Sequence, residues 1–174
     1  MRKTMHETGA RNGAASAARG GLYTPDQRAR RDATVWTLVQ GILAPLQFLA
    51  FAISLVLVLR YLATGDGYLA ATVSILIKTA LLLTIMVTGA IWEKVVFGQY
   101  LLAPAFFWED VVSFVVIALH LAYVAALMTS ALNSAGQMWL ALAAYATYAV
   151  NAAQFVLKLR RARLQSAAQT GGAA

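Results

Sequence analysis

Four long apolar stretches constrain the fold of this chain more than any other feature of its sequence. Each has about 20 residues or more, and a helix of that length crosses a hydrocarbon core about 30 Å thick. Strands of a membrane barrel would be about 10 residues long with strict alternation of apolar and polar side chains, which these stretches lack. The sequence therefore predicts an all-α fold with four transmembrane helices, at Val35–Tyr61, Leu69–Trp92, Val111–Leu132 and Met138–Leu157.

The composition agrees with a membrane protein and excludes several other classes. Hydrophobic residues make up 60% and charged residues 12% of the 174 residues, whereas soluble domains are about 45–50% apolar and about 25% charged. A soluble domain of this size lacks the interior to bury so much apolar surface. The lack of cysteine excludes disulfides, iron–sulfur clusters and thiol nucleophiles, and two histidines are too few for a multi-histidine metal site.

The distribution of positive charge predicts which side of the membrane each end occupies. Seven of the 14 Lys and Arg residues lie in residues 1–33, and four more follow the last apolar stretch. The two short turns, Thr64–Gly67 and Asn133–Gly136, have only Arg60 beside them. Because positive residues stay on the cytoplasmic side, we expect both termini to be cytoplasmic. Nucleic-acid binding needs a basic face on a folded domain, and this pattern does not provide one.

The connection between the second and third stretches differs from these two turns. This connection, Val95–Asp110, contains Pro104 and is rich in aromatic residues, so we expect it to lie at headgroup depth. Residues 22–164 are then expected to form one transmembrane domain. The tails at 1–21 and 165–174 are rich in small, polar or basic residues, and we expect both to be disordered.

Polar side chains also lie within the apolar stretches, where each needs a partner. Gln47, Lys78 and His120 lie in the first three stretches. In the fourth, the polar residues form one helical stripe, at Thr147, Asn151, Gln154 and Lys158. Neutral side chains commonly hydrogen-bond between membrane helices, and a buried histidine is more often an interhelical donor than a ligand. Both that structural role and ligand binding fit these residues.

Three carboxylates are expected near one membrane face, beside the aromatic connection. Trp92-Glu93 closes the second stretch, and Trp108-Glu109-Asp110 opens the third. Acids and tryptophans favour membrane interfaces, and acidic residues suit a helix N-terminus. Alternatively, carboxyl groups gathered in a partly apolar site keep one of them protonated at neutral pH, as general acid–base chemistry requires. The two interpretations stay equally open on these residues alone.

Longer motifs make the chain similar to a known family. These motifs are Leu22–Arg28, Trp36–Phe48, Ile91–Lys94 and Ala103–Asp110. On them the chain resembles the 3-vinyl bacteriochlorophyllide hydratase family of anoxygenic phototrophs, over roughly residues 22–164. The resemblance implies a lyase that adds water across the 3-vinyl group of a chlorophyllide or bacteriochlorophyllide. The product carries a 3-(1-hydroxyethyl) group, on the route to bacteriochlorophyll a.

The same resemblance implies the surroundings of such an enzyme. It places the chain in the bacterial inner membrane, in its photosynthetic intracytoplasmic part. It implies no cofactor, since water is the co-substrate and the magnesium belongs to the chlorin. The partners are then the pigment and the lipid bilayer, with a homo-oligomer or other pigment-biosynthesis enzymes as further candidates.

Two other functions compete with the hydratase. The first is a non-catalytic pigment-binding or assembly protein of the photosynthetic membrane. The second, which has weaker support, is a small transporter with Lys78 in a proton relay. Transporters of this size often contain inverted repeats, and the halves of this chain share little beyond the two Trp-Glu pairs.

Hydration chemistry, taken with the resemblance, assigns roles to the carboxylates. Hydration of a vinyl group needs an acid that protonates the terminal carbon and a base that takes a proton from the attacking water. We expect Glu109 to be the general acid and Glu93 or Asp110 the base. Glu93 and Glu109 are also expected to face each other across the hairpin opening within about 10 Å, since acid–base partners flank their reactant at about 5–10 Å.

Other polar and aromatic residues are expected to bind the pigment. A flat chlorin suits a slot between helices that is lined by apolar and aromatic side chains, here with Trp92 and Trp108. By analogy with other tetrapyrrole sites, His120 is a candidate axial ligand of the pigment magnesium. Lys78 is expected to pair with a carboxylate of the substrate or of the protein. Candidates to hold the attacking water or ring carbonyls are Gln47, Asn151 and Gln154.

Overall fold

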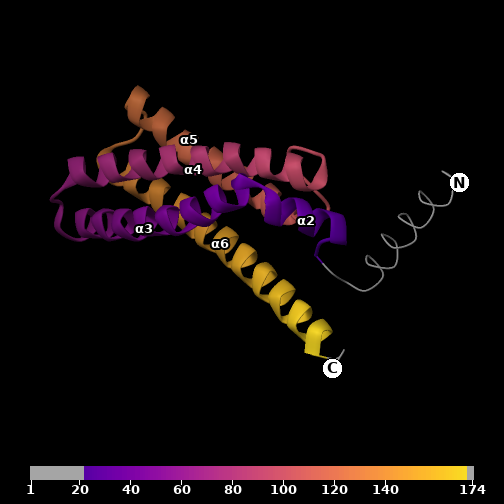
Figure 1. The fold of residues 1–174 in the computed structure, drawn as a ribbon. Coiled ribbons are helices and arrows are strands. Elements are labelled where there is room, and N and C mark those ends of the chain that lie inside the picture. The colour runs from indigo at the N-terminus through magenta and orange to yellow at the C-terminus, as the bar shows by residue number, and fades with distance from the viewer. Residues whose placement is uncertain (1–21, 172–174) are drawn as a thin grey trace, which may run out of the picture.

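The computed structural model describes residues 22–171, with side chains up to residue 164. This part of the chain consists of helices and connecting loops, without a strand. Four of its helices are long and apolar enough to span a membrane, which confirms the expected fold class. The helices are α2 (Pro25–Ala33), α3 (Val35–Thr64), α4 (Tyr68–Phe97), α5 (Phe107–Thr129) and α6 (Ser134–Gly171) (Figure 1).

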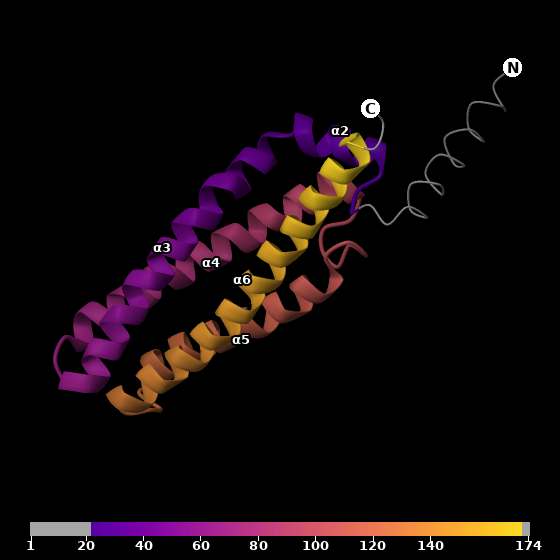
Figure 2. The same cartoon turned by 90° about the horizontal axis from the view of Figure 1, so that it is seen from below.

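Two antiparallel hairpins, α3 with α4 and α5 with α6, lie side by side in the bundle (Figure 2). Gly65 and Gly67 turn the first hairpin with φ angles of 80° and 89°, which glycine adopts without steric cost. Both hairpin turns lie at one end of the bundle, which we call the turn end. The opposite end, which we call the basic end, carries the Lys and Arg residues of α2, of the last turn of α4 and of the C-terminal part of α6, namely Arg28, Arg30, Arg31, Lys94, Lys158, Arg160, Arg161 and Arg163.

The spanning helices extend beyond the apolar stretches of the sequence. α4 continues through Glu93 to Phe97, and α5 begins at Phe107, before its two acidic residues. Hydropathy misses such ends because charged residues stay helical when their side chains reach polar partners. α6 continues to Gly171, seven residues past the expected domain boundary. The expected disorder of residues 1–21 and 172–174 concerns a part of the chain outside the described residues.

Neutral polar side chains link the helices inside the bundle. Gln40 on α3 donates a hydrogen bond to Thr88 on α4 at 2.8 Å, and the Ser54 and Tyr145 hydroxyls of α3 and α6 lie 2.5 Å apart. Such bonds are the structural role that the sequence offers for polar residues in membrane spans. The apolar core around them contains the fully or nearly fully buried side chains of Val58, Ile75, Tyr123, Met138 and Tyr145.

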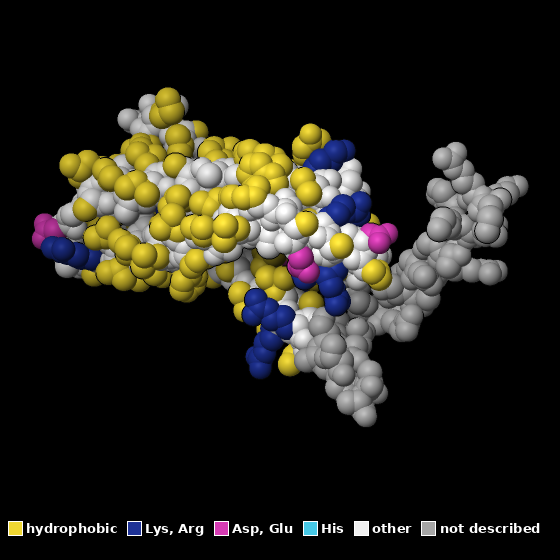
Figure 3. Space-filling view, in the orientation of Figure 1, with side chains coloured by type: hydrophobic (Ala, Val, Ile, Leu, Met, Phe, Trp, Pro, Cys, Tyr) yellow, Lys and Arg dark blue, Asp and Glu magenta, His cyan; other side chains and the backbone are white. Residues whose placement is uncertain are grey.

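Apolar side chains cover the sides of the bundle, and charged side chains gather at its two ends (Figure 3). Large hydrophobic residues of several helices are more than half exposed, among them Leu38, Val56, Leu69, Val87 and Met128. A soluble monomer rarely shows so continuous an apolar surface. The surface therefore supports the membrane location that the four spans indicate.

Helix α2 was not expected from the sequence pattern, which predicts no helix before Val35. The Gln27 backbone N–H donates to the Thr24 hydroxyl at 3.3 Å, and the Thr24 N–H donates to the Gln27 side chain at 2.9 Å. Pro25 takes the first helical position, where its missing N–H costs nothing. This capping box was readable in the sequence, but the search for apolar periodicity does not detect it.

Candidate active site

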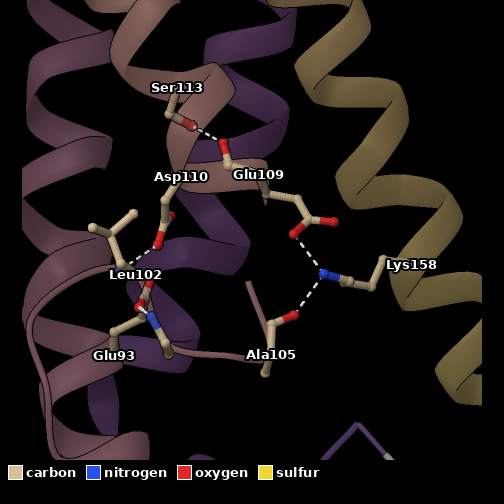
Figure 4. A network of polar contacts seen from close by, with 8 residues as sticks. Glu93, Leu102, Ala105, Glu109, Asp110, Ser113 and Lys158 are labelled. Atoms are coloured by element: carbon tan, nitrogen blue, oxygen red, sulfur yellow. Dashed lines mark hydrogen bonds and ion pairs between the residues drawn. The ribbon is translucent and has the colours of Figure 1, made fainter. Parts of the chain in front are cut away.

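Three buried carboxyl groups lie together at the basic end (Figure 4). Glu93 stands near the end of α4, and Glu109 and Asp110 stand on the first turn of α5. The exposed fractions of Glu93, Glu109 and Asp110 are 5%, 6% and 4%. Burial of a carboxyl group is costly without a hydrogen bond or an opposite charge, and each of the three has such a partner.

Glu93 and Asp110 form a carboxyl pair beneath the connection between α4 and α5. Their side chains interact directly with each other. The Leu102 N–H donates to Asp110 at 2.7 Å, and the Ala103 N–H donates to Glu93 at 3.2 Å. Leu102 has a φ of 59°, a region that non-glycine residues rarely adopt. Two buried carboxylates side by side repel each other unless one of them carries a proton, so the pair is suited to share one proton.

Glu109 points away from this pair, toward α6 (Figure 4). Its carboxylate accepts a hydrogen bond from the Lys158 ammonium at 2.5 Å, and this contact is also an ion pair. Lys158 donates a second hydrogen bond to the Ala105 carbonyl and lies 5.1 Å from the centre of the Phe106 ring. The ion pair supplies the buried Glu109 carboxylate with the opposite charge that its burial requires.

The prediction that Glu93 and Glu109 face each other is therefore wrong. Glu93 faces Asp110, while Glu109 is directed to the other side of α5. Adjacent residues on a helix point about 100° apart, so Glu109 and Asp110 cannot both face α4. The sequence places the three carboxylates near one another, but it does not show which two of them form a pair.

A pocket of about 310 Å³ opens beside the Glu109–Lys158 ion pair. Most of its wall comes from one face of α6, and Leu22 adds an apolar side chain from the segment before α2. The lining residues are Leu22, Glu109, Gln154, Leu157, Lys158, Arg161 and Ala162. Of the predicted site residues, this pocket thus contains Glu109 and Gln154, whereas Glu93 and Asp110 lie outside its lining.

Several buried amide groups near this end have unused hydrogen-bonding capacity. Asn151 donates to the Ser113 hydroxyl at 2.6 Å, and Ser113 donates to the Glu109 carbonyl at 2.8 Å. The side-chain oxygens of Asn151 and Gln154 have no hydrogen-bond partner among the described residues. The same is true of both amide atoms of Gln47, whose exposed fraction is 2%. These three predicted residues therefore retain the polar atoms that a water molecule or a ring carbonyl would contact.

Lys78 and His120 form a separate pair deeper in the bundle. The Lys78 ammonium nitrogen lies 2.9 Å from Nε2 of His120 and 4.0 Å from the centre of the Tyr148 ring. His120 Nδ1 lies 2.7 Å from the Val116 carbonyl oxygen. Lys78 thus pairs with a histidine and not with a carboxylate of the protein. Both ring nitrogens of His120 already have partners, so this arrangement leaves no free nitrogen to ligate a magnesium ion.

The two tryptophans of the Trp-Glu motifs have different surroundings. Trp92 donates from its indole nitrogen to the Thr37 hydroxyl at 2.9 Å and packs edge-on against Phe106, at a centroid distance of 5.7 Å. Trp108 instead is 69% exposed on the outer surface of α5. It therefore does not line a slot between the helices, and its position fits the tendency of tryptophan to lie at membrane interfaces.

Tyr23 joins the segment before α2 to the same end of the bundle. Its ring stacks on Phe97 with a centroid distance of 5.8 Å, and the Arg31 guanidinium lies 4.8 Å from its centre. Burial raises the pKa of the Tyr23 hydroxyl, and the positive charge of Arg31 partly opposes that rise. These contacts explain why Leu22 is in place to line the pocket.

The two basic pocket residues, Lys158 and Arg161, are absent from the site predicted from the sequence. Both counted there as evidence for the cytoplasmic side, and Lys158 also as the end of a polar stripe. The signal for Lys158 was present, since it continues the polar stripe of Asn151 and Gln154 along α6. Arg161 lies one turn further, beyond the apolar stretch, where sequence alone does not separate it from the neighbouring arginines.

Comparisons with known proteins identify the family. Residues 23–161 match the family model described as 2-vinyl bacteriochlorophyllide hydratase. A protein of that name from Rhodobacter capsulatus is 69% identical over 161 residues, which cover 92% of this chain and 94% of the relative. A protein of the same name from Cereibacter sphaeroides is 77% identical over 143 residues, covering 82% and 89%. No solved structure matches the chain. The chain therefore belongs to the 2-vinyl bacteriochlorophyllide hydratase family.

Proposed function

We propose that this chain is a hydratase that adds water across the vinyl group of a bacteriochlorophyllide. Position 2 in the older tetrapyrrole numbering is position 3 in the systematic one, so the family name and the 3-vinyl group expected from the sequence refer to one substituent. The observation that carries the proposal is the presence, within the segment that matches the family, of two kinds of buried carboxyl group. One kind is the Glu93–Asp110 pair of neighbouring carboxyl groups, and the other is Glu109 in its ion pair with Lys158.

The proposed reaction is balanced by one water molecule. An acid gives its proton to the terminal carbon of the vinyl group, which becomes a methyl group. The positive charge left on the inner carbon is delocalised into the macrocycle. The oxygen of water bonds to that carbon, and a base takes the released proton, giving the 1-hydroxyethyl product. No electrons are transferred, so the reaction calls for no redox cofactor, and the magnesium is part of the substrate.

The carboxyl groups fit the two roles in an order that differs from the one expected from the sequence. The Glu93–Asp110 pair is suited to share a proton between two acids and is proposed as its donor. Glu109 is proposed as the base, because it is ion-paired to Lys158 and lines the pocket. A carboxylate held by an ammonium is a poor proton donor, which argues against Glu109 as the acid.

The amides nearest to Glu109 are proposed to position the water. Asn151 is linked to Glu109 through Ser113, and Gln154 lines the pocket itself. Their unpaired oxygens would accept hydrogen bonds from a water molecule held for attack. Gln47 is proposed to contact a polar group of the pigment from α3.

The setting of the enzyme is proposed from the same relatives. The four spans make the chain a membrane protein, and we propose the intracytoplasmic part of the bacterial inner membrane as its site. Association with a second copy or with other enzymes of pigment synthesis remains part of this proposal.

Hydration in labelled water tests the function directly. Purified protein in detergent is mixed with the 3-vinyl pigment in water enriched in ¹⁸O, and the pigment is analysed by mass spectrometry. A hydratase yields a hydroxyethyl product with one ¹⁸O atom, and boiled protein yields none. Pigment that binds but keeps its mass would contradict the proposal and favour a pigment-binding protein.

A further inference from the structure

We propose that the pocket beside Glu109 binds the propionate carboxylate of the pigment, and that Arg161 is the residue that recognises it. This inference rests on the proposed function and adds a determinant of substrate specificity. A name ending in "chlorophyllide" denotes a pigment whose propionic acid side chain is free, whereas the corresponding chlorophyll carries an ester there. The chemical group to be recognised is therefore a carboxylate on a short aliphatic arm.

The size and the lining of the pocket match such an arm. A volume of about 310 Å³ is at the lower limit for sites that enclose a drug-sized ligand, so the pocket accepts the edge of a tetrapyrrole and not the whole macrocycle. Leu22, Leu157 and Ala162 provide apolar contact for methylene groups. Lys158 and Arg161 provide positive charge on the same face of α6.

Among the described charged residues of the pocket, Arg161 is the one available to bind a carboxylate of the substrate. Lys158 is occupied by Glu109 and by the Ala105 carbonyl. The ion pairs of the described side chains are Arg31–Asp32 and Lys158–Glu109, so within residues 22–164 Arg161 has no carboxylate partner. One net positive charge therefore remains in the pocket. A guanidinium binds a carboxylate through two parallel hydrogen bonds, which an ester cannot accept in the same way.

The position of the pocket also suits the reaction. The vinyl group and the propionate arm stand on neighbouring rings of the macrocycle. A pigment held by its carboxylate at Arg161 would present the adjacent vinyl-bearing ring to Glu109, which lines the same pocket. The apolar rest of the macrocycle would extend from the pocket toward lipid.

The test compares the free-acid pigment with its methyl ester, using wild-type protein, Arg161→Gln and the control Arg160→Gln. Arg160 is an exposed arginine on the same helix and does not line the pocket. Both the Kd, from quenching of pigment fluorescence, and the KM for hydration are measured. We expect Arg161→Gln to raise Kd and KM for the free acid about 10- to 100-fold, as loss of a charged hydrogen bond does. The ester values should change less than about twofold, and Arg160→Gln should resemble the wild type.

The outcomes separate this inference from the proposed function. Equal effects of Arg161→Gln on acid and ester, or equal effects of the two variants, would overturn the assignment of Arg161 even if hydration proceeds normally. A selective loss of affinity for the free acid supports the carboxylate site by the binding readout alone. If that selectivity appears while no protein hydrates the pigment, the site stands and the hydratase proposal fails.

Discussion

Glu109 and Asp110 are adjacent in the chain, yet they have opposite electrostatic surroundings. Asp110 faces the Glu93 carboxyl group and accepts a hydrogen bond from the Leu102 N–H. Glu109 instead contacts the Lys158 ammonium. Environments that hold one carboxyl protonated and its neighbour ionised are how enzymes obtain an acid and a base from the same residue type. The assignment of roles therefore depends on partners and not on residue identity.

Variants that remove an acidic proton from the Glu93–Asp110 pair test this assignment of roles. Glu93→Gln and Asp110→Asn keep size and hydrogen bonding but remove an acidic proton, so each should lower kcat by about 10²-fold or more, with little change in pigment Kd. Turnover is measured by product formation and binding by pigment fluorescence. The matched control is Asp66→Asn at the turn end, an exposed acid that should keep wild-type kcat. Near-normal turnover of both well-folded variants would remove the pair from the mechanism.

At the scale of elements, α2 helps to position Leu22, which forms one wall of the pocket at the basic end. It is a helix of nine residues, and it depends on its capping box and on the contacts of Tyr23 for stability. Isolated helices of this length are marginal in water, so the cap and the packing decide whether it forms. Because α2 follows Leu22 directly, its stability affects one wall of the pocket.

Loss of the cap should loosen this element without unfolding the bundle. Thr24→Ala removes the acceptor for the Gln27 N–H and should destabilise α2 by about 1 kcal/mol, whereas Thr24→Ser keeps an acceptor and should behave like the wild type. Hydrogen exchange of the α2 amides, followed by mass spectrometry, measures the change. Unaltered protection of residues 25–33 in Thr24→Ala would show that the cap does not stabilise α2.

At the scale of the whole molecule, the two ends of the bundle have different chemistry. The turn end has two short turns, while the basic end has eight Lys and Arg residues among the described side chains, together with the carboxyl groups and the pocket. Between them the surface is apolar on several helices (Figure 3). By the bias of positive charge, the basic end is expected to be the cytoplasmic one, which would place the candidate active site at the cytoplasmic face.

This orientation has a direct test. A reporter that is active only in the cytoplasm, fused after Ala174, should be active, and the same reporter inserted in the turn at Asn133–Gly136 should be silent. A reporter that is active only outside the cytoplasm should give the reverse pattern at both positions. Activity of the cytoplasmic reporter at the turn, with silence at the C-terminus, would invert the expected topology.

The sequence by itself determined the helical class, the four spans and the neighbourhood of the active-site candidates. Membrane spans can be recognised in a sequence because a helix in lipid must satisfy all of its backbone hydrogen bonds internally. Its length and hydropathy therefore suffice to detect it. The adjacency of Glu93 to Glu109 and Asp110 followed from two antiparallel helices joined by one connection. The charged helix ends and the capped helix α2 were not predicted from the sequence, because they depend on side-chain partners and on local capping.

Only the tertiary structure decided which side chains the candidate site residues contact. The rotation of α5 turns Asp110 to Glu93 and Glu109 to Lys158, and a shift of one residue along that helix would break this pairing. The approach of α4 to α5 brings Lys78 to His120 and occupies the ring nitrogen that the sequence left available for magnesium. The packing of the segment before α2 on α6 completes the pocket around Arg161. Each of these contacts joins residues far apart in the chain, and such contacts depend on how helices rotate and pack, which hydropathy and periodicity do not encode.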